Sequence, residues 1–294
     1  MNKILITGVA GFLGSNLAKE LIKDEDNIVF GIDDLSCSSM SNLYPLLRND
    51  RFNFFQLNLV DKIPFNVDYL YHLAGNGDNS KYFENKFENT LLNIEVTKNI
   101  LEYTKATGCK SIFTVGFVDY QQHNLEYFMK YDLMRMNQDL ILEYANKNNL
   151  DCKIAKLTNP YGQNMKNSDN RFIPKVINKA YHNENIVIEN DKSSFYTYSK
   201  DVVLALKTIM NSYCDSNVID VSSSNLHLKS DIAKLIITFT KSKSKVIINN
   251  QEVYHPNYKP NLTILNNELN FRCTTPILEG ISKTIDYFRL MYFC

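Results

Sequence analysis

The chain has 294 residues, of which 44% are hydrophobic, and it carries 32 basic and 32 acidic side chains. It can bury a sizeable core, and its balanced charge favours neither nucleic acid nor an anionic membrane as a partner. The six cysteines form no disulfide or metal-binding pattern, and we find no signal peptide and no apolar run near the roughly 18 residues that span a membrane. We therefore expect a cytoplasmic protein without a bound metal.

Short apolar runs alternate with longer helical patterns through the first half of the chain. Strands are expected at residues 3–7, 28–32, 52–57, 69–73, 111–115 and 153–157, and helices at 13–23, 88–107 and 131–148. This alternation is typical of a parallel sheet with crossover helices. The sequence therefore predicts an α/β protein: a Rossmann-type, doubly wound parallel sheet over residues 1–160, which carries the catalytic helix, and a smaller C-terminal substrate-binding lobe over residues 161–294. Chain crossovers between the two parts are allowed.

Three glycines lie between the first expected strand and the first expected helix. Gly8 allows a tight turn, Gly11 lets backbone N–H groups approach a diphosphate, and Gly14 lets the helix pack close to the strand. The second strand ends in Asp33, 19 residues after Gly14, where a carboxylate can accept hydrogen bonds from the hydroxyls of an adenosine ribose. An acid at that position repels the 2′-phosphate of NADP. The pattern predicts a site for NAD, and His72, which has no metal-binding partner, is expected to line the same cleft.

The glycine spacing, Asp33-Asp34-Leu35-Ser36, the stretch 68–74, Asn93 and Asn159-Pro160-Tyr161-Gly162 occur in an order that resembles the extended short-chain dehydrogenase/reductase family. The similarity is to its NAD-dependent nucleotide-sugar epimerases and dehydratases, and the register is closest to UDP-glucuronate decarboxylase-like proteins. The resemblance implies that NAD is held by the following residues: Gly8, Gly11, Phe12, Leu13, Gly14, Asp33, Asn58, Leu73, Ala74, Gly75, Asn93, Tyr131 and Arg135.

The resemblance also implies a catalytic site on the helix at 131–148, where Tyr131 would remove the proton of a sugar hydroxyl. The family has a lysine four residues later, but here Arg135 occupies that position on the same helix face. Arginine keeps the positive charge that favours a tyrosinate, although it cannot relay a proton. The family's Ser or Thr at the end of the strand 111–115 is replaced by Gly116, and Thr114, one pleat deeper, is the expected substitute.

Two enzyme subgroups are disfavoured by missing residues. Decarboxylases of this family carry a Glu just after the Ser or Thr and dehydratases an Asp-Glu pair, whereas this chain has Phe117-Val118. Tyr120 and Tyr127 are alternatives to Tyr131 as the base. The expected substrate-binding residues are Asn159, Arg171, Lys175 and Lys259.

Two functions remain open. The first is an NAD-dependent oxidoreductase or epimerase that acts at C4 of a nucleotide-activated sugar by hydride transfer, in the biosynthesis of surface polysaccharide. The second, which Gly116 and Arg135 favour, is a catalytically degenerate member that binds NAD(H) and a nucleotide sugar without turnover. The resemblance further implies that the helices at 88–107 and 131–148 pair across a two-fold axis, which predicts a homodimer or a dimer of dimers.

Overall fold

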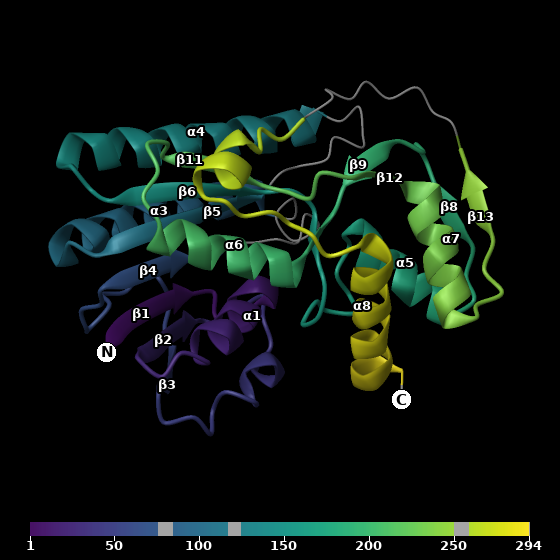
Figure 1. Ribbon diagram of the computed structural model, residues 1–294, viewed down its shortest axis with the longest axis horizontal. Coiled ribbons are helices and arrows are strands. Elements are labelled where there is room, and N and C mark those ends of the chain that lie inside the picture. The colour runs from purple at the N-terminus through teal and green to yellow at the C-terminus, as the bar shows by residue number, and fades with distance from the viewer. Residues whose placement is uncertain (76–84, 117–124, 250–258, 294) are drawn as a thin grey trace.

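The computed structural model describes residues 1–75, 85–116, 125–249 and 259–293. Its centre is a seven-stranded parallel sheet with the order β11-β6-β5-β4-β1-β2-β3 (Figure 1). Because β1 pairs with both β2 and β4, the winding of the chain reverses between β1 and β4. In such sheets, ligands bind beyond the carboxyl ends of the strands at this point. The strands are β1 (Asn2–Thr7), β2 (Asn27–Asp33), β3 (Phe52–Gln56), β4 (Tyr69–His72), β5 (Lys110–Gly116), β6 (Cys152–Leu157) and β11 (Val218–Val221).

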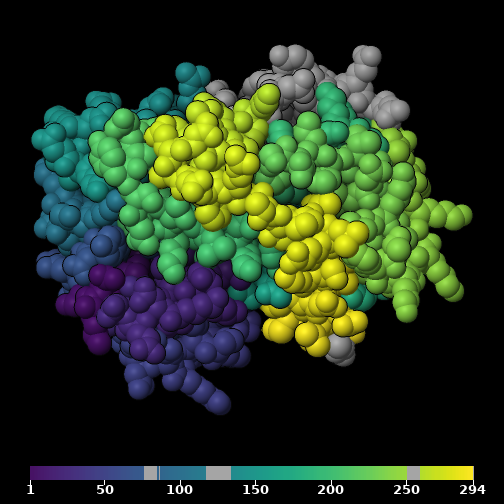
Figure 2. Space-filling view, in the orientation of Figure 1, coloured from purple at the N-terminus to yellow at the C-terminus, as the bar shows by residue number. Residues whose placement is uncertain are grey.

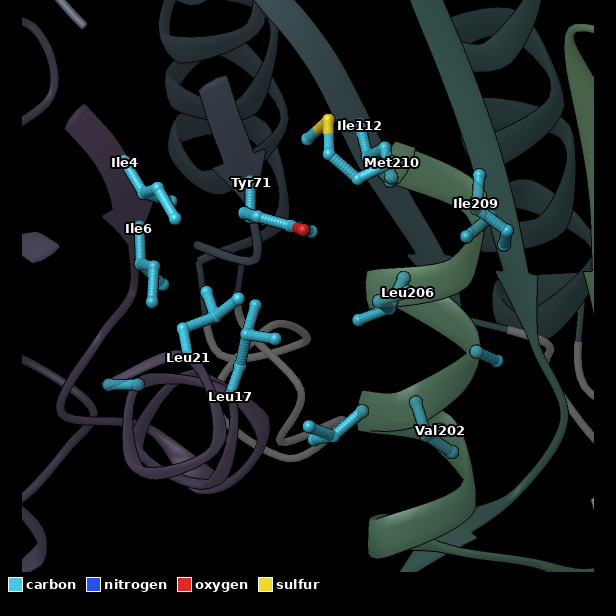
Figure 3. Close-up of a cluster of buried hydrophobic side chains, with 14 of the residues drawn as sticks. Ile4, Ile6, Leu17, Leu21, Tyr71, Ile112, Val202, Leu206, Ile209 and Met210 are labelled. Carbon is cyan, nitrogen blue, oxygen red and sulfur yellow. The ribbon is translucent and has the colours of Figure 1, made fainter. Parts of the chain in front are cut away.

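Helices cover both faces of this sheet. One face carries α1 (Phe12–Leu21) and α6 (Ser199–Asn211), and the other carries α3 (Lys86–Thr107) and α4 (Leu125–Asn148). Side chains alternate along β1, because Ile4 and Ile6 join the core under α1 and α6, whereas Leu5 joins the core under α3 and α4. Figure 3 shows Leu17 and Leu21 of α1 facing side chains of α6 across the first of these cores. The predicted doubly wound Rossmann-type fold is confirmed.

The six strands and three helices expected in the first half are all present, although α4 already begins at Leu125. The seventh strand was not expected, since β11 comes from the second half of the chain and pairs with β6 in parallel. α6 also comes from that half and packs under the sheet with α1. The chain thus crosses back after residue 160, and a single cut there does not separate the two parts of the molecule.

The second part of the molecule has a core of its own. Its helices α5 (Phe172–Tyr181), α7 (Lys229–Thr240) and α8 (Ile277–Tyr292) pack together with three small two-stranded sheets. The chain reaches α8 by way of the π-helix η2 (Ile264–Glu268), which packs beside β11, so the last segment bridges both parts (Figure 2). The remaining elements are η1 (Met40–Leu43), β7 (Pro160–Tyr161), β8 (Ile186–Ile188), β9 (Ser193–Phe195), β10 (Thr197–Tyr198), β12 (Leu226–Leu228) and β13 (Val246–Ile248).

Within the described ranges, no helix is both long enough and apolar enough to cross a membrane.

Candidate functional site

The turn from β1 into α1 leaves no room for a side chain at Gly8, in the loop, or at Gly14, the third residue of α1. Gly8 has a φ of +70°, and a Cβ there would lie 2.8 Å from the backbone of Ala74, which follows β4. A Cβ at Gly14 would collide with the carbonyl oxygen of Gly8. Among the described residues, a Cβ at Gly11 would meet only that same oxygen, at 3.1 Å, so they leave the outer side of the loop open. The first-turn N–H groups of α1, which have no acceptor within the helix, can therefore be reached by an anion.

Asp33, at the end of β2, is fastened to this loop. Its Oδ2 accepts a hydrogen bond from the backbone N–H of Ala10 at 3.0 Å, and its Oδ1 accepts from the N–H of Leu35 at 2.9 Å and the hydroxyl of Ser38 at 2.6 Å. A carboxylate has about four acceptor positions, so the protein fills three and leaves about one for a ribose hydroxyl. Sequence reasoning missed Ser38, which helps to orient this carboxylate.

A buried histidine closes the end of β4. His72 Nδ1 lies 2.7 Å from Thr7 Oγ1, and burial lowers the pKa of His72 to about 4, so the ring is neutral at pH 7. The hydroxyl of Thr114, on β5, donates to the carbonyl oxygen of His72 at 3.1 Å. Among the described residues, no cluster of His, Cys, Asp and Glu side chains could hold a metal ion. His72 therefore links the end of β4 to Thr7 at the end of β1.

The end of β5 meets α4. Gly116 is exposed, and among the described residues the one atom within 4 Å of a Cβ placed on it is Met134 Cε, at 3.8 Å. Tyr131 occupies the helical position one turn before Met134, and Arg135, whose side chain is exposed, follows four residues after Tyr131. The side chain of Tyr131 lies outside the described residues, as do Phe117, Val118, Tyr120 and the side chain of Tyr127. Position 131 is thus one helical turn away from the residue whose side chain approaches Gly116.

One cation from the second part of the molecule reaches the phosphate loop. Arg171, at the N-terminal cap of α5, lies with its guanidinium carbon 5.1 Å from the ring centre of Phe12, the first residue of α1. Its Nε donates to both carboxylate oxygens of Asp169, at 3.0 and 3.1 Å. The Asp-x-Arg spacing was visible in the sequence, but its contact with Phe12 was not. The ion pair of Arg171 with Asp169 thus stands at the rim of the loop, with the guanidinium against the ring of Phe12.

A buried polar network joins the same loop to the second part. Asn164 donates to Ser15 Oγ at 2.9 Å, and Ser15 in turn donates to the carbonyl of Gly11 at 2.7 Å. The amide of Asn42 donates to the carbonyls of Ala10, at 2.9 Å, and Asn164, at 3.4 Å. Sequence reasoning missed all three side chains, because their partners lie far away along the chain. The network fixes the loop from behind.

The other predicted residues divide into two groups. Leu73, Ala74 and Gly75 follow β4 beside Gly8, and the exposed Asn58 follows β3, at the same edge of the sheet. By contrast, Asn93 is exposed on α3 and donates to the carbonyl of Asn89 in its own helix. In the second part of the molecule, the amide of Asn159 donates to the carbonyl of Phe195, and Lys175 and Lys259 are exposed.

NAD fits the groups at this edge. The open side of Gly11 and the N–H groups of Phe12 and Leu13, which begin α1, suit a diphosphate, and the remaining acceptor position of Asp33 suits a ribose hydroxyl. Together with the switch in winding between β1 and β4, these features define a dinucleotide-binding protein of the Rossmann type.

The chain belongs to the NAD-dependent epimerase/dehydratase family, whose model matches residues 4–221. It is similar to UDP-glucuronic acid decarboxylase 1 of Danio rerio, with 23% identity over 97% of this chain and 72% of that protein. It is also similar to UDP-glucuronic acid decarboxylase 5 of Arabidopsis thaliana, with 22% identity over 98% of this chain and 89% of that protein.

Solved structures share the fold. The UDP-glucuronic acid 4-epimerase of Bacillus cereus, in complex with UDP-glucuronic acid and NAD, has a TM-score of 0.85 at 20% identity, over 99% of this chain and all of that one (100%). The UDP-glucose 4-epimerase of Thermotoga maritima, with UDP-glucose, has a TM-score of 0.83 at 19% identity, over 98% of this chain and 99% of that one.

The predicted family, its enzymatic character and its dependence on NAD are confirmed. The resemblance to UDP-glucuronate decarboxylase-like proteins is also confirmed. The roles of individual residues, the oligomeric state and the cytoplasmic location stay predictions.

Proposed function

We propose that the protein acts on the C4 hydroxyl of a nucleotide-activated sugar, as an epimerase or dehydrogenase, in surface polysaccharide biosynthesis. The observation that carries this proposal is the juxtaposition of α4 and β5: Met134, one turn after Tyr131, approaches Gly116 at the carboxyl edge of the sheet, where the phosphate loop also lies. NAD, when bound, supplies the hydride acceptor. The chain itself has to position the sugar and move one proton.

Tyr131 would take the proton of the C4 hydroxyl, as a base held within hydrogen-bonding reach. Arg135, four residues later on the helix, supplies positive charge that favours the tyrosinate. Thr114 can only accept a hydrogen bond from the sugar, because its own proton is donated to the carbonyl of His72. Gly116 offers no hydroxyl, and one missing hydrogen bond costs roughly 1–3 kcal/mol.

UDP-glucuronic acid is the first substrate to test. It appears in the names of the similar decarboxylases and of the Bacillus cereus epimerase. Arg171 stands at the rim of the phosphate loop, and Asn159, Lys175 and Lys259 are the further predicted substrate contacts. Because Phe117-Val118 replaces the decarboxylase Glu, we expect the sugar carboxylate to be retained.

The test is to incubate the protein and NAD with a panel of UDP-sugars and to identify the products by NMR. Tyr131→Phe should lower turnover by about 10²- to 10⁴-fold and leave NAD affinity unchanged. Tyr144→Phe is the matched control, since Tyr144 lies on the same helix but bonds to Glu102 of α3. Wild-type turnover in Tyr131→Phe would exclude this residue as the base.

The second candidate function is binding without turnover. Gly116 and Arg135 favour it, because both differ from the catalytic residues that the family implies. This function would replace the first if calorimetry detects binding of UDP-sugars while none of them changes the absorbance of bound NADH or yields a product.

We also propose that the protein forms a dimer through α3 and α4. These neighbouring helices cover one face of the sheet, and several large apolar side chains on them remain exposed (Figure 1). Leu91 and Ile94 on α3 are 50% and 44% exposed, and Met136 and Leu140 on α4 are 58% and 46% exposed. An apolar surface of this kind marks an interface. Light scattering should give at least a dimer for the wild type and a monomer for Leu91→Glu combined with Leu140→Glu.

A further inference from the structure

A lysine is buried at the edge of the sheet that lies opposite the cofactor edge. Lys153 is the second residue of β6, and only 5% of its surface is exposed. The strands are parallel, so the start of β6 lies far from the phosphate loop, which follows the end of β1. Lysine is seldom buried without a polar partner, because removal of its charged form from water is costly.

The partner of this lysine is Cys214, in the loop between α6 and β11. Lys153 Nζ lies 3.0 Å from Cys214 Sγ and 3.4 Å from the carbonyl oxygen of the same residue. In the described part of the chain, no carboxylate lies within 4 Å of Lys153, whereas its surface neighbour Lys110 pairs with Asp151. Lys153 Nζ thus donates a hydrogen bond to Cys214 Sγ, and the thiol also lies 3.4 Å from the carbonyl oxygen of Ser216.

We propose that Lys153 and Cys214 form a covalent N–O–S bridge when the protein meets a hydroperoxide. The sulfur of a cysteine is oxidised by peroxide to a sulfenic acid, which a neighbouring nucleophile can attack. The hydrogen bond of 3.0 Å holds N and S so close that a small further approach would accommodate one bridging oxygen atom, whereas a direct N–S bond would require a much closer approach. Cys214 is 7% exposed and follows Tyr213, which is 86% exposed, so the pair is buried next to an exposed residue, and the proposal requires a small oxidant to enter there.

The chemistry balances with two molecules of hydrogen peroxide. The sulfur of Cys214 attacks one peroxide oxygen, the O–O bond breaks, and a sulfenic acid and water form. The amine of Lys153 attacks the second peroxide in the same way, which gives a hydroxylamine and water. The hydroxylamine oxygen then attacks the sulfenic sulfur, forms the O–S bond and expels a third water. Sulfur and nitrogen are oxidised, and both peroxides are reduced to water.

The neighbouring buried cysteine provides a contrast. Cys152 precedes Lys153 in the chain and is 2% exposed, but burial raises its pKa to about 12. Burial also raises the pKa of Cys109. Both side chains stay protonated at neutral pH and react slowly with peroxide. Oxidation should therefore select Cys214 over these two residues.

The bridge would stabilise the edge of the central sheet by linking β6 to the loop before β11. Lys153 and Cys214 are 61 residues apart in the sequence, and β11, which begins shortly after Cys214, pairs in the central sheet with β6 alone. A link between the start of β6 and the loop before β11 limits the separation of these strands on unfolding. We expect the midpoint of thermal unfolding to rise when the bridge forms.

The experiment treats the full-length protein with hydrogen peroxide and maps its peptides by mass spectrometry. The expected product joins the peptides of Lys153 and Cys214, with a mass equal to their sum plus one oxygen less two hydrogens, and dithiothreitol removes it. The rise in the unfolding midpoint should accompany this product. Cys152→Ala, which leaves the pair intact, should form as much of it as the wild type.

Lys153→Arg and Cys214→Ser should form none of the product. The proposal is overturned if the wild type carries a sulfinic acid or an unmodified thiol at Cys214 without the link. It is equally overturned if the linked peptides lack the additional oxygen. Because the wild type alone gives this readout, the result does not depend on whether the variants fold.

Discussion

The phosphate loop and the junction of β5 with α4 lie at the same edge of one sheet, but they differ in how tightly they are packed. Side chains cannot be added at Gly8 or Gly14, and Asp33 accepts three hydrogen bonds from the protein. Among the described residues, the nearest atom to a Cβ added at Gly116 is 3.8 Å away. Packing thus constrains the phosphate loop closely, whereas the described residues leave space at Gly116, and we expect substitutions there to be accommodated. Cofactor binding can therefore persist while turnover is lost or regained.

The largest expected effect is a loss of stability in acid, which arises from the buried His72 beside the phosphate loop. Burial lowers the pKa of His72 from 6.5 to about 4, so the unfolded chain binds a proton that the folded chain excludes between these values. The free energy of unfolding is therefore unaffected by His72 above pH 6.5 and decreases as the pH falls toward 4. The free energy of unfolding should drop by up to about 3 kcal/mol over this interval, because each pKa unit corresponds to about 1.4 kcal/mol. Urea unfolding across the pH range measures it.

His72→Gln supplies the control for this pH dependence. A glutamine can still bond to Thr7 Oγ1 but does not titrate, so the slope of stability against pH should flatten. Equal slopes in the variant and the wild type would assign the acid sensitivity to other groups.

Gly116→Ser tests the open junction. No described atom lies closer than 3.8 Å to a Cβ at Gly116, so we expect a serine to fit there and its hydroxyl to restore the hydrogen bond to the sugar that the family implies. We expect turnover to rise by about 10- to 100-fold, with NAD affinity unchanged. Gly116→Ala adds the same Cβ without the hydroxyl and should gain nothing. If both variants behave alike in steady-state kinetics, the hydroxyl is not what the site lacks.

The same contrast explains what could be predicted from the sequence. The phosphate loop is local: Gly8, Gly11 and Gly14 act within one turn, and Asp33 follows the next strand, so their spacing predicts their arrangement. The strands of the first half are β-branched or aromatic runs with a clear period. These features depend on few contacts between distant residues.

Contacts across the chain could not be predicted in this way. β11 is only four residues long, and its place beside β6 depends on packing with α6 and η2. The approach of Arg171 to Phe12 depends on how the second part docks against α1. Lys153 looked like a polar residue in a strand, and only the fold places Cys214 against it.

A substitution of Asp33 should change the preference for NAD over NADP by less than Gly116→Ser changes turnover. Asp33→Ala removes the acceptor for the ribose hydroxyl and the charge that repels a 2′-phosphate, so NAD affinity should fall roughly tenfold and the preference over NADP should narrow. Ser38→Ala is the control, since it removes one bond to the carboxylate but leaves its charge. Calorimetry with both cofactors measures the effect, and an unchanged preference in Asp33→Ala would show that selectivity arises elsewhere.

The smallest expected effect concerns Arg135, which separates an enzyme from a binding protein. Its side chain is exposed, so water and salt weaken its influence on Tyr131. If the protein is an enzyme, Tyr131 titrates below its usual value of about 10, and Arg135→Met should lower turnover by less than about tenfold and shift the rate profile to higher pH. Arg135→Lys should match or exceed the wild type, because lysine keeps the charge and can also release a proton. In a binding protein neither variant changes a rate, since none exists. If the enzyme is active and neither substitution changes the pH dependence of its turnover, the charge at position 135 does not act on the base.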